Sequence, residues 1–186
     1  MSKSIYDYKN CQSLFGYAQM VHERSGGICQ FCGCGANLEP NTDAYFDLWR
    51  QLTVEHLVGQ AKDGYLKELK TAVARRFSGF SSEELVQVVK QIDEANTITV
   101  CHLCNSMTSR DSNLKTTKAM TELLSEAVGD PQDVVKQVTV RLYEIQERKK
   151  NDVLWKLQSV RKAFRELVEP KLKDYRAHHQ RQEKLL

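Results

Sequence analysis

Cysteines are the residues of this sequence whose spacing most directly suggests chemistry, because four of the six form two Cys-x-x-Cys pairs. One pair lies in CQFC at 29–32 and the other in CHLC at 101–104. Each such turn lets two sulfurs reach one ion, and four thiolates match the closed tetrahedral site that Zn²⁺ prefers. We therefore expect a structural zinc ion bound by Cys29, Cys32, Cys101 and Cys104. Cys34 is an alternative ligand in the first pair, since CGC at 32–34 supplies another cysteine close by.

A second group of polar residues lies around the cysteine pairs. Glu55 and His56, in VEH at 54–56, fall between the pairs, and Asn96 and Asn105 flank the second pair nine residues apart. Carboxylate and amide oxygens suit a hard cation such as Mg²⁺ or Mn²⁺. Histidine, with an ordinary pKa of about 6.5, can accept a proton at neutral pH. Phosphodiester hydrolysis needs both functions, an activated water and a cation that neutralises the phosphate.

This order of residues resembles the HNH endonuclease family in its zinc-braced, four-cysteine form. The resemblance covers roughly residues 28–116 and implies a small ββα-metal core. In such a core a β-hairpin delivers the acidic residue and the histidine, and a helix that begins near the second cysteine pair delivers the last metal ligand. The four cysteines would be structural.

The resemblance also implies roles for individual residues. Glu55 and Asn105 would bind the catalytic divalent cation, Mg²⁺ or Mn²⁺, and His56 would be the general base. Asn96 would fix the loop that holds His56. Glu55 stands where Asp is commoner in the family, and Asn105 stands where His is commoner. Arg110, five residues past Asn105, is a candidate contact to the phosphate backbone, with a solvated surface arginine as the equal alternative.

Around these residues the sequence predicts an α+β fold that is mostly helical. Apolar spacing predicts a helix over 4–24, which Ser25-Gly26-Gly27 ends. Aromatic and β-branched residues predict a strand over 45–58. Two short helices are expected between 63 and 95, the second begun by a capping box of Ser81 and Glu84. Another helix is expected over 116–128, and after the Gly129-Asp130-Pro131 break a long helical tail runs to the end.

These elements suggest three segments. Residues 1–27 form a helical N-terminal segment, and residues 28–116 form the nuclease core. The connection between His56 and Asn96 is longer than usual in the family, so residues 61–94 are predicted to be a helical insertion. Residues 117–186 form a basic helical region.

The tail carries most of the positive charge. Residues 131–186 hold 14 Lys and Arg against 8 Asp and Glu, whereas residues 1–130 hold 13 against 16. This basic surface would bind along a DNA backbone, because such binding releases condensed counterions. The alternative is an ordinary solvated helix face. The apolar positions of the tail step by four and three residues, with an interruption expected at Pro170. They would pack against the chain's own core or form the seam of a homodimer; the apolar positions are Val153, Leu157, Val160, Phe164 and Leu167.

Composition narrows the class of protein further. The sequence contains no apolar run long enough for a membrane span and no secretion signal, so we expect a soluble, cytoplasmic protein. The paired cysteines then favour metal binding over disulfides. His102, inside the second cysteine pair, is expected to be solvated, with a substitute zinc ligand or a phosphate contact as the alternatives. The histidines at positions 22, 178 and 179 are expected at the surface.

Together these observations predict a metal-dependent HNH endonuclease that hydrolyses phosphodiester bonds in double-stranded DNA, of restriction type or otherwise site-specific. The alternative is a non-catalytic zinc-ribbon module that binds DNA. A third possibility is a helical interaction adaptor in which the zinc site only stabilises the fold.

Overall fold

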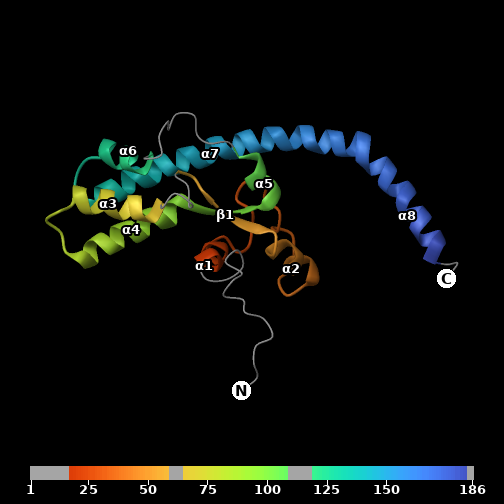
Figure 1. Cartoon of the computed structure of the whole chain (residues 1–186), viewed down its shortest axis with the longest axis horizontal. Coiled ribbons are helices and arrows are strands. Elements are labelled where there is room, and N and C mark those ends of the chain that lie inside the picture. Colours follow the sequence, from red (N-terminus) through yellow and green to blue (C-terminus); the bar gives the residue numbers. More distant parts are fainter. Residues whose placement is uncertain (1–16, 59–64, 109–118, 184–186) are drawn as a thin grey trace, which may run out of the picture.

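The computed structural model describes residues 17–58, 65–108 and 119–183, and within them the fold is α+β and mostly helical, as predicted. Figure 1 shows helices arranged around a small sheet, with one long helix running past the body of the molecule. In chain order the elements are α1 (Tyr17–Arg24), α2 (Asp43–Trp49), β1 (Leu52–His56), α3 (Tyr65–Arg76), α4 (Ser82–Asn96), β2 (Thr97–Cys101), α5 (His102–Met107), α6 (Ala119–Glu126), α7 (Pro131–Ala163), a π-helical turn (Phe164–Val168) and α8 (Glu169–Glu183).

The sheet consists of β1 and β2, which pair antiparallel in a register that runs from Leu52 opposite Cys101 to His56 opposite Thr97. The helices α3 and α4 lie between the two strands in the sequence. Helix α1 lies against one side of the sheet, and α5 and α7 lie on the other side (Figure 1). The two faces of a short strand pair therefore meet different helices.

The two short helices predicted between residues 63 and 95 are confirmed as α3 and α4. The predicted capping box begins α4: Ser81 Oγ accepts a hydrogen bond from the Glu84 amide at 3.3 Å, and Glu84 Oε2 accepts one from the Ser81 amide at 2.8 Å. Apolar side chains of both helices share one core with α7, because their stripes recur at helical spacing. The fully buried members include Leu69, Ile92 and Leu142.

The prediction of a strand over 45–58 is wrong in its first half, since α2 occupies Asp43–Trp49 and the strand begins only at Leu52. Thr42 Oγ1 accepts a hydrogen bond from the Tyr45 amide and caps α2. Tyr45 Oη donates to the Gly26 carbonyl at 2.9 Å, which holds the helix over the preceding turn. Local capping thus decides the conformation of aromatic residues that would otherwise favour a strand.

At the N-terminal end the predicted helix over 4–24 is present as α1, and residues 4–16 lie outside the described part. The glycines expected to end it do so: Gly26 and Gly27 both have positive φ, 61° and 69°. The Gly27 amide donates to the His22 carbonyl at 2.9 Å and closes the last turn.

The long tail also begins as predicted. Asp130 caps α7 through its Oδ1, which accepts hydrogen bonds from the amides of Gln132 and Asp133, both at 2.9 Å. Pro131 occupies the first turn, where its missing amide hydrogen is not needed. The interruption predicted at Pro170 takes another form, since the chain stays helical and passes through the π-helical turn just before this proline.

Packing of the tail against the core is confirmed only for its first part. Val153 is fully buried and Leu157 is partly buried against the core. Farther along, Val160, Phe164 and Leu167 are 44%, 45% and 64% exposed, on the part of the helix that extends from the body (Figure 1). Among the described residues, no helix combines the length and apolar character that a membrane span requires.

Candidate metal centres

Cysteine sulfurs converge at one end of the sheet. The ligand atoms of Cys29, Cys32, Cys34 and Cys101 all lie within 4.8 Å of one another, and the Sγ atoms of Cys32 and Cys101 are 3.9 Å apart. A tetrahedral ion with Zn–S bonds of about 2.3 Å requires sulfur–sulfur edges of about 3.8 Å. A four-cysteine cluster is therefore present, and its dimensions suit a structural Zn²⁺; it contains three of the four predicted ligands, Cys29, Cys32 and Cys101.

The first cysteine turn is built by short backbone hydrogen bonds. The Gly33 amide donates to the Cys29 carbonyl at 2.8 Å, and the Cys29 amide donates to the Cys34 carbonyl at 3.1 Å. Gly33 has φ of 73°, a conformation that favours glycine. The turn is attached to β2, because the Gln30 amide donates to the Thr99 carbonyl at 2.9 Å.

The second cysteine turn joins β2 to α5. Cys101 is the last residue of β2 and the N-cap of α5, and Cys104 is fully buried within that helix. The His102 amide donates to the Gln51 carbonyl at 2.9 Å, which holds this junction against the start of β1. A bound zinc ion would thus tie residues 29–34 to the strand–helix junction, and its binding energy would stabilise the fold.

The tightest group of four contains Cys34 where the two Cys-x-x-Cys pairs predict Cys104. Hydrogen bonds with the side chains of Cys101 and Cys29 lower the pKa of Cys32, which favours the thiolate that a metal requires. Burial, and then the neighbouring Cys32, raise the pKa of Cys34 to about 12. Burial likewise raises the pKa of Cys104, whose sulfur also meets Cys32 and Cys101. Five cysteines therefore surround a site that needs four.

Glu55 lies at the other end of β1 from the cysteines and is only 9% exposed. Its Oε1 is 2.5 Å from Nζ of Lys149 on α7, and both side chains are almost excluded from solvent, 12% and 10% exposed. Because side chains alternate along a strand, Glu55 shares its sheet face with Thr53. Sequence reasoning did not identify Lys149, which is 94 residues away.

Asn105 approaches the same face from α5. Its Nδ2 donates to Thr53 Oγ1 at 3.0 Å. The Asn105 amide oxygen and the Glu55 carboxylate are oxygen donors from two elements that meet on one face of the sheet. This donor set is of the kind that Mg²⁺ and Mn²⁺ prefer, although Lys149 now neutralises Glu55.

His56 points to the opposite face, because it follows Glu55 in the strand. Its ring lies 5.3 Å from that of Tyr65 and 6.4 Å from that of Tyr17, measured between centroids. Burial lowers the pKa of His56, and the positive charge of Lys149 lowers it further. The imidazole is therefore neutral at neutral pH, the form that can accept a proton.

Asn96 is completely buried at the end of α4. Its Oδ1 accepts a hydrogen bond from the Val58 amide at 2.9 Å, and its Nδ2 donates to the Val58 carbonyl at 2.8 Å. Its own carbonyl accepts from the Leu57 amide at 2.9 Å. Asn96 thus holds the two residues that follow His56.

The structure therefore brings Glu55 and Asn105 to one face, His56 to the other and Asn96 behind the segment that follows His56. Arg110 lies outside the described residues. His102 is exposed, as predicted, but the same prediction for His22 is wrong. His22 is fully buried because α1 packs on the sheet, and its Nδ1 lies 3.0 Å from Thr99 Oγ1.

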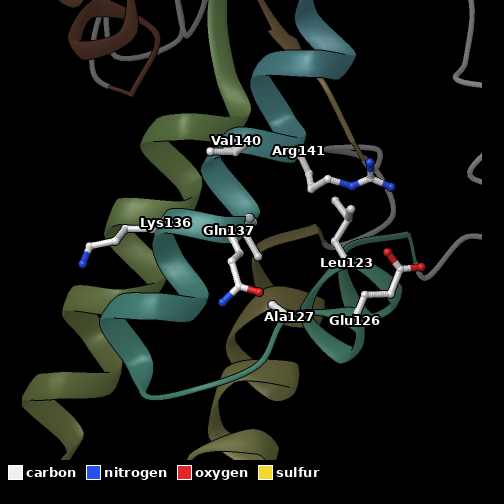
Figure 2. A pocket seen from close by; sticks show the side chains of 8 residues that line it. Leu123, Glu126, Ala127, Lys136, Gln137, Val140 and Arg141 are labelled. Atoms are coloured by element: carbon white, nitrogen blue, oxygen red, sulfur yellow. The ribbon is translucent and has the colours of Figure 1, made fainter.

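A separate hollow of about 410 Å³ lies between α6 and α7 (Figure 2). Leu123, Ala127 and Val140 contribute apolar surface, and Lys136 and Arg141 supply charges at its margin. None of the residues predicted to form a metal or catalytic site lines this hollow.

No protein-family model matches the chain, and comparisons with curated proteins and with solved structures likewise give no match.

Proposed function

We propose that this protein is an HNH-type, divalent-metal-dependent endonuclease that hydrolyses phosphodiester bonds of double-stranded DNA. The observation that carries the proposal is the pair of hydrogen bonds between Asn96 and Val58, which hold the chain directly after a neutral, partly buried His56. A module that only binds DNA needs neither a histidine kept neutral nor an asparagine that orders its flanking chain.

In this proposal each side chain has a separate task. His56 takes the proton from the attacking water, and Asn96 keeps the end of β1 in place. Glu55 and Asn105 hold the cation, Mg²⁺ or Mn²⁺, which when bound neutralises the scissile phosphate and stabilises the leaving 3′ oxygen. Because Glu55 and His56 point to opposite faces, the phosphate would lie across the end of β1, where side chains from both faces can reach it.

The four-cysteine cluster supports the proposal as a brace. Zinc held between the first cysteine turn and the β2–α5 junction would fix α5 against the sheet, and α5 carries Asn105. The ligands proposed from the two Cys-x-x-Cys pairs are Cys29, Cys32, Cys101 and Cys104, with Cys34 as a neighbouring thiol.

The tail is the proposed DNA-binding surface. Many of its lysines pair with acids one turn away, as Lys162 does with Glu166 at 4.0 Å. Arg161, Arg165 and Arg176 form no ion pair with another described residue, so their charges are available to phosphates. Binding through such contacts should weaken steeply as salt rises.

One active site cuts one strand, so a double-strand cutter of restriction type would act as a homodimer. The exposed apolar side chains of the tail, including Val160, Phe164 and Leu167, are the proposed interface with a second copy. A helix that leaves the body with such a face gains stability when the face is covered.

A zinc-dependent DNA-binding module is the second candidate. The ion pair of Glu55 with Lys149 favours this candidate, because the carboxylate that was expected to bind a cation is already neutralised by a lysine. In that case the protein would bind DNA and never cut it.

Cleavage of supercoiled plasmid by the purified protein decides between the two. We expect cutting with Mg²⁺ or Mn²⁺, none with EDTA, and none by His56→Ala, which should still bind DNA and retain zinc. Metal-independent degradation, or equal cutting by His56→Ala, would reject the proposed mechanism. DNA binding without cutting of unmodified or modified DNA would favour the binding module.

A further inference from the structure

The carboxylate proposed to bind a divalent cation already contacts a cation of the chain. Lys149 Nζ lies 2.5 Å from Glu55 Oε1, and neither side chain is more than 12% exposed. The ammonium group thus lies next to an oxygen that a metal ion would use. A cation bound at Glu55 would be repelled by the positive charge of Lys149, and little water is present to screen this repulsion.

The backbone at Lys149 has little freedom to withdraw. Ile145 and Val153, one turn before and after it, are 4% and 0% exposed. Nearby on α7, Lys156 Nζ donates to the Met107 carbonyl at 2.9 Å and so attaches α7 to the end of α5. The flexible four-carbon side chain of Lys149 is therefore the part that can move away from Glu55.

A phosphate is the group that would relieve this conflict. Its nonbridging oxygens can accept hydrogen bonds from an ammonium group while they also coordinate a divalent cation. Lys149 also acts electrostatically on His56, so its charge reaches both proposed functional faces at the end of β1. A DNA phosphate that entered there would find an ammonium group already beside the metal ligand.

We propose that Lys149 couples divalent-cation binding at Glu55 to the arrival of a DNA phosphate. Without DNA, Lys149 neutralises Glu55 and weakens cation binding. When a phosphate enters, the ammonium group turns to its oxygens and Glu55 becomes available to the cation. Lys149 would then be a phosphate contact in the loaded site, and this role rests on the proposed function.

The test is direct Mn²⁺ binding to the full-length, zinc-loaded protein, with free Mn²⁺ followed by electron paramagnetic resonance. All proteins carry His56→Ala, so that added duplex DNA stays intact. The variants are Lys149→Met, which removes the charge, and Lys149→Gln, which keeps a hydrogen-bond donor for Glu55 if the methionine variant folds poorly. Lys150→Met is the matched control, because the neighbouring Lys150 faces Glu147 on the surface of α7. Glu55→Gln removes the proposed carboxylate ligand, so the Mn²⁺ binding that this variant loses is the binding at the proposed site.

Without DNA, we expect both Lys149 variants to bind Mn²⁺ at least tenfold more tightly than the parent protein or Lys150→Met. Duplex DNA should tighten Mn²⁺ binding at least tenfold in the parent and much less in the Lys149 variants. Equal Glu55-dependent affinities in all proteins, with and without DNA, would overturn the role of Lys149 while leaving the metal site intact. Absence of Glu55-dependent binding in every protein would overturn the metal site and this inference together.

Discussion

The side chain of Asn96 and the backbone of Val58 are joined by two buried hydrogen bonds across 38 residues of sequence. The amide group of Asn96 satisfies both the N–H and the carbonyl of Val58, as a partner strand would. The pairing of β1 with β2 ends at His56 and Thr97. Asn96 therefore keeps the chain ordered just past the point where the sheet stops.

Replacing Asn96 by Ala should lower the free energy of unfolding by about 3 kcal/mol, because two buried backbone groups lose their partner. Cleavage should fall with it, since the chain after His56 is released. Asn105→Ala is the matched comparison: it removes a single hydrogen bond, to Thr53, and should cost about 1 kcal/mol while it abolishes cleavage. Chemical unfolding curves and plasmid cleavage measure the two effects. An Asn96→Ala protein as stable as the parent would contradict the assigned role.

The Glu55–Lys149 pair predicts strong coupling in stability. Removing either partner alone leaves a charge with little access to water, so Glu55→Gln and Lys149→Met should each lower the free energy of unfolding by about 3 kcal/mol. The double variant should be destabilised by clearly less than the sum of the two single changes. Unfolding in urea, with the four proteins compared under one set of conditions, measures this coupling. Additive effects would show that the two side chains do not interact in solution.

The zinc ligands can be assigned by comparing two serine variants. We expect Cys104→Ser to lose most of its zinc and to unfold at a lower temperature, and Cys34→Ser to keep one zinc per chain. The reason is that each Cys-x-x-Cys turn supplies two sulfurs to a closed site of four. Metal analysis and the absorption of the Co²⁺-substituted proteins report the ligand set. The opposite result would assign the site to the tighter group that contains Cys34.

Burial and the charge of Lys149 both lower the pKa of His56, which predicts how the pH affects this residue. Nuclear magnetic resonance of its ring protons should give a pKa below the ordinary value of about 6.5, and Lys149→Met should raise it. The unfolded state takes up the proton first, so His56 contributes stability above about pH 6.5 that is lost as the pH falls through its folded pKa. An unchanged pKa in Lys149→Met would refute the electrostatic link between the two residues.

Features whose partners are close in the sequence were the ones that sequence reasoning predicted well. The capping box of Ser81 with Glu84 and the start of α7 at Asp130 each depend on residues no more than three positions apart. The cysteine pairs belong to the same kind of signal, because Cys-x-x-Cys limits the geometry of two ligands at once. By contrast, the spacing favoured Cys104 as the fourth ligand, whereas the tertiary packing places Cys34 in the tightest group of sulfurs.

Features formed by distant residues were missed for a physical reason. Lys149 lies in a helix with many other basic residues, and only the packing of α7 on the sheet distinguishes it from a solvated lysine. His22 was expected at the surface because a single histidine in a predicted helix carries no sequence signal for burial. The packing of α1 on β2 and the contact with Thr99 bury it. Once the position of β1 is known, the alternation of side chains along a strand places Glu55 and His56 on opposite faces.

Self-association through the tail is a further prediction. The apolar side chains from Val160 to Leu167 lie beyond the region that Val153 anchors to the core, and a second copy would cover them. We expect the protein to be a dimer by light scattering and Phe164→Ser/Leu167→Ser to be a monomer with unchanged zinc content. Val140→Ser is the control, because Val140 is 58% exposed on the part of α7 that packs against α4.

If the protein is the proposed nuclease, the monomeric variant should nick supercoiled plasmid but form linear product far more slowly, because each proposed active site would cut one strand. The same variant should show Mn²⁺ binding equal to that of the parent, since Glu55 and Lys149 lie on the anchored part of the structure. A parent protein that is monomeric both free and on DNA would remove the homodimer from the proposal. The tail would then serve DNA binding through its arginines, and the salt dependence of binding by Arg161→Gln/Arg165→Gln would measure that role.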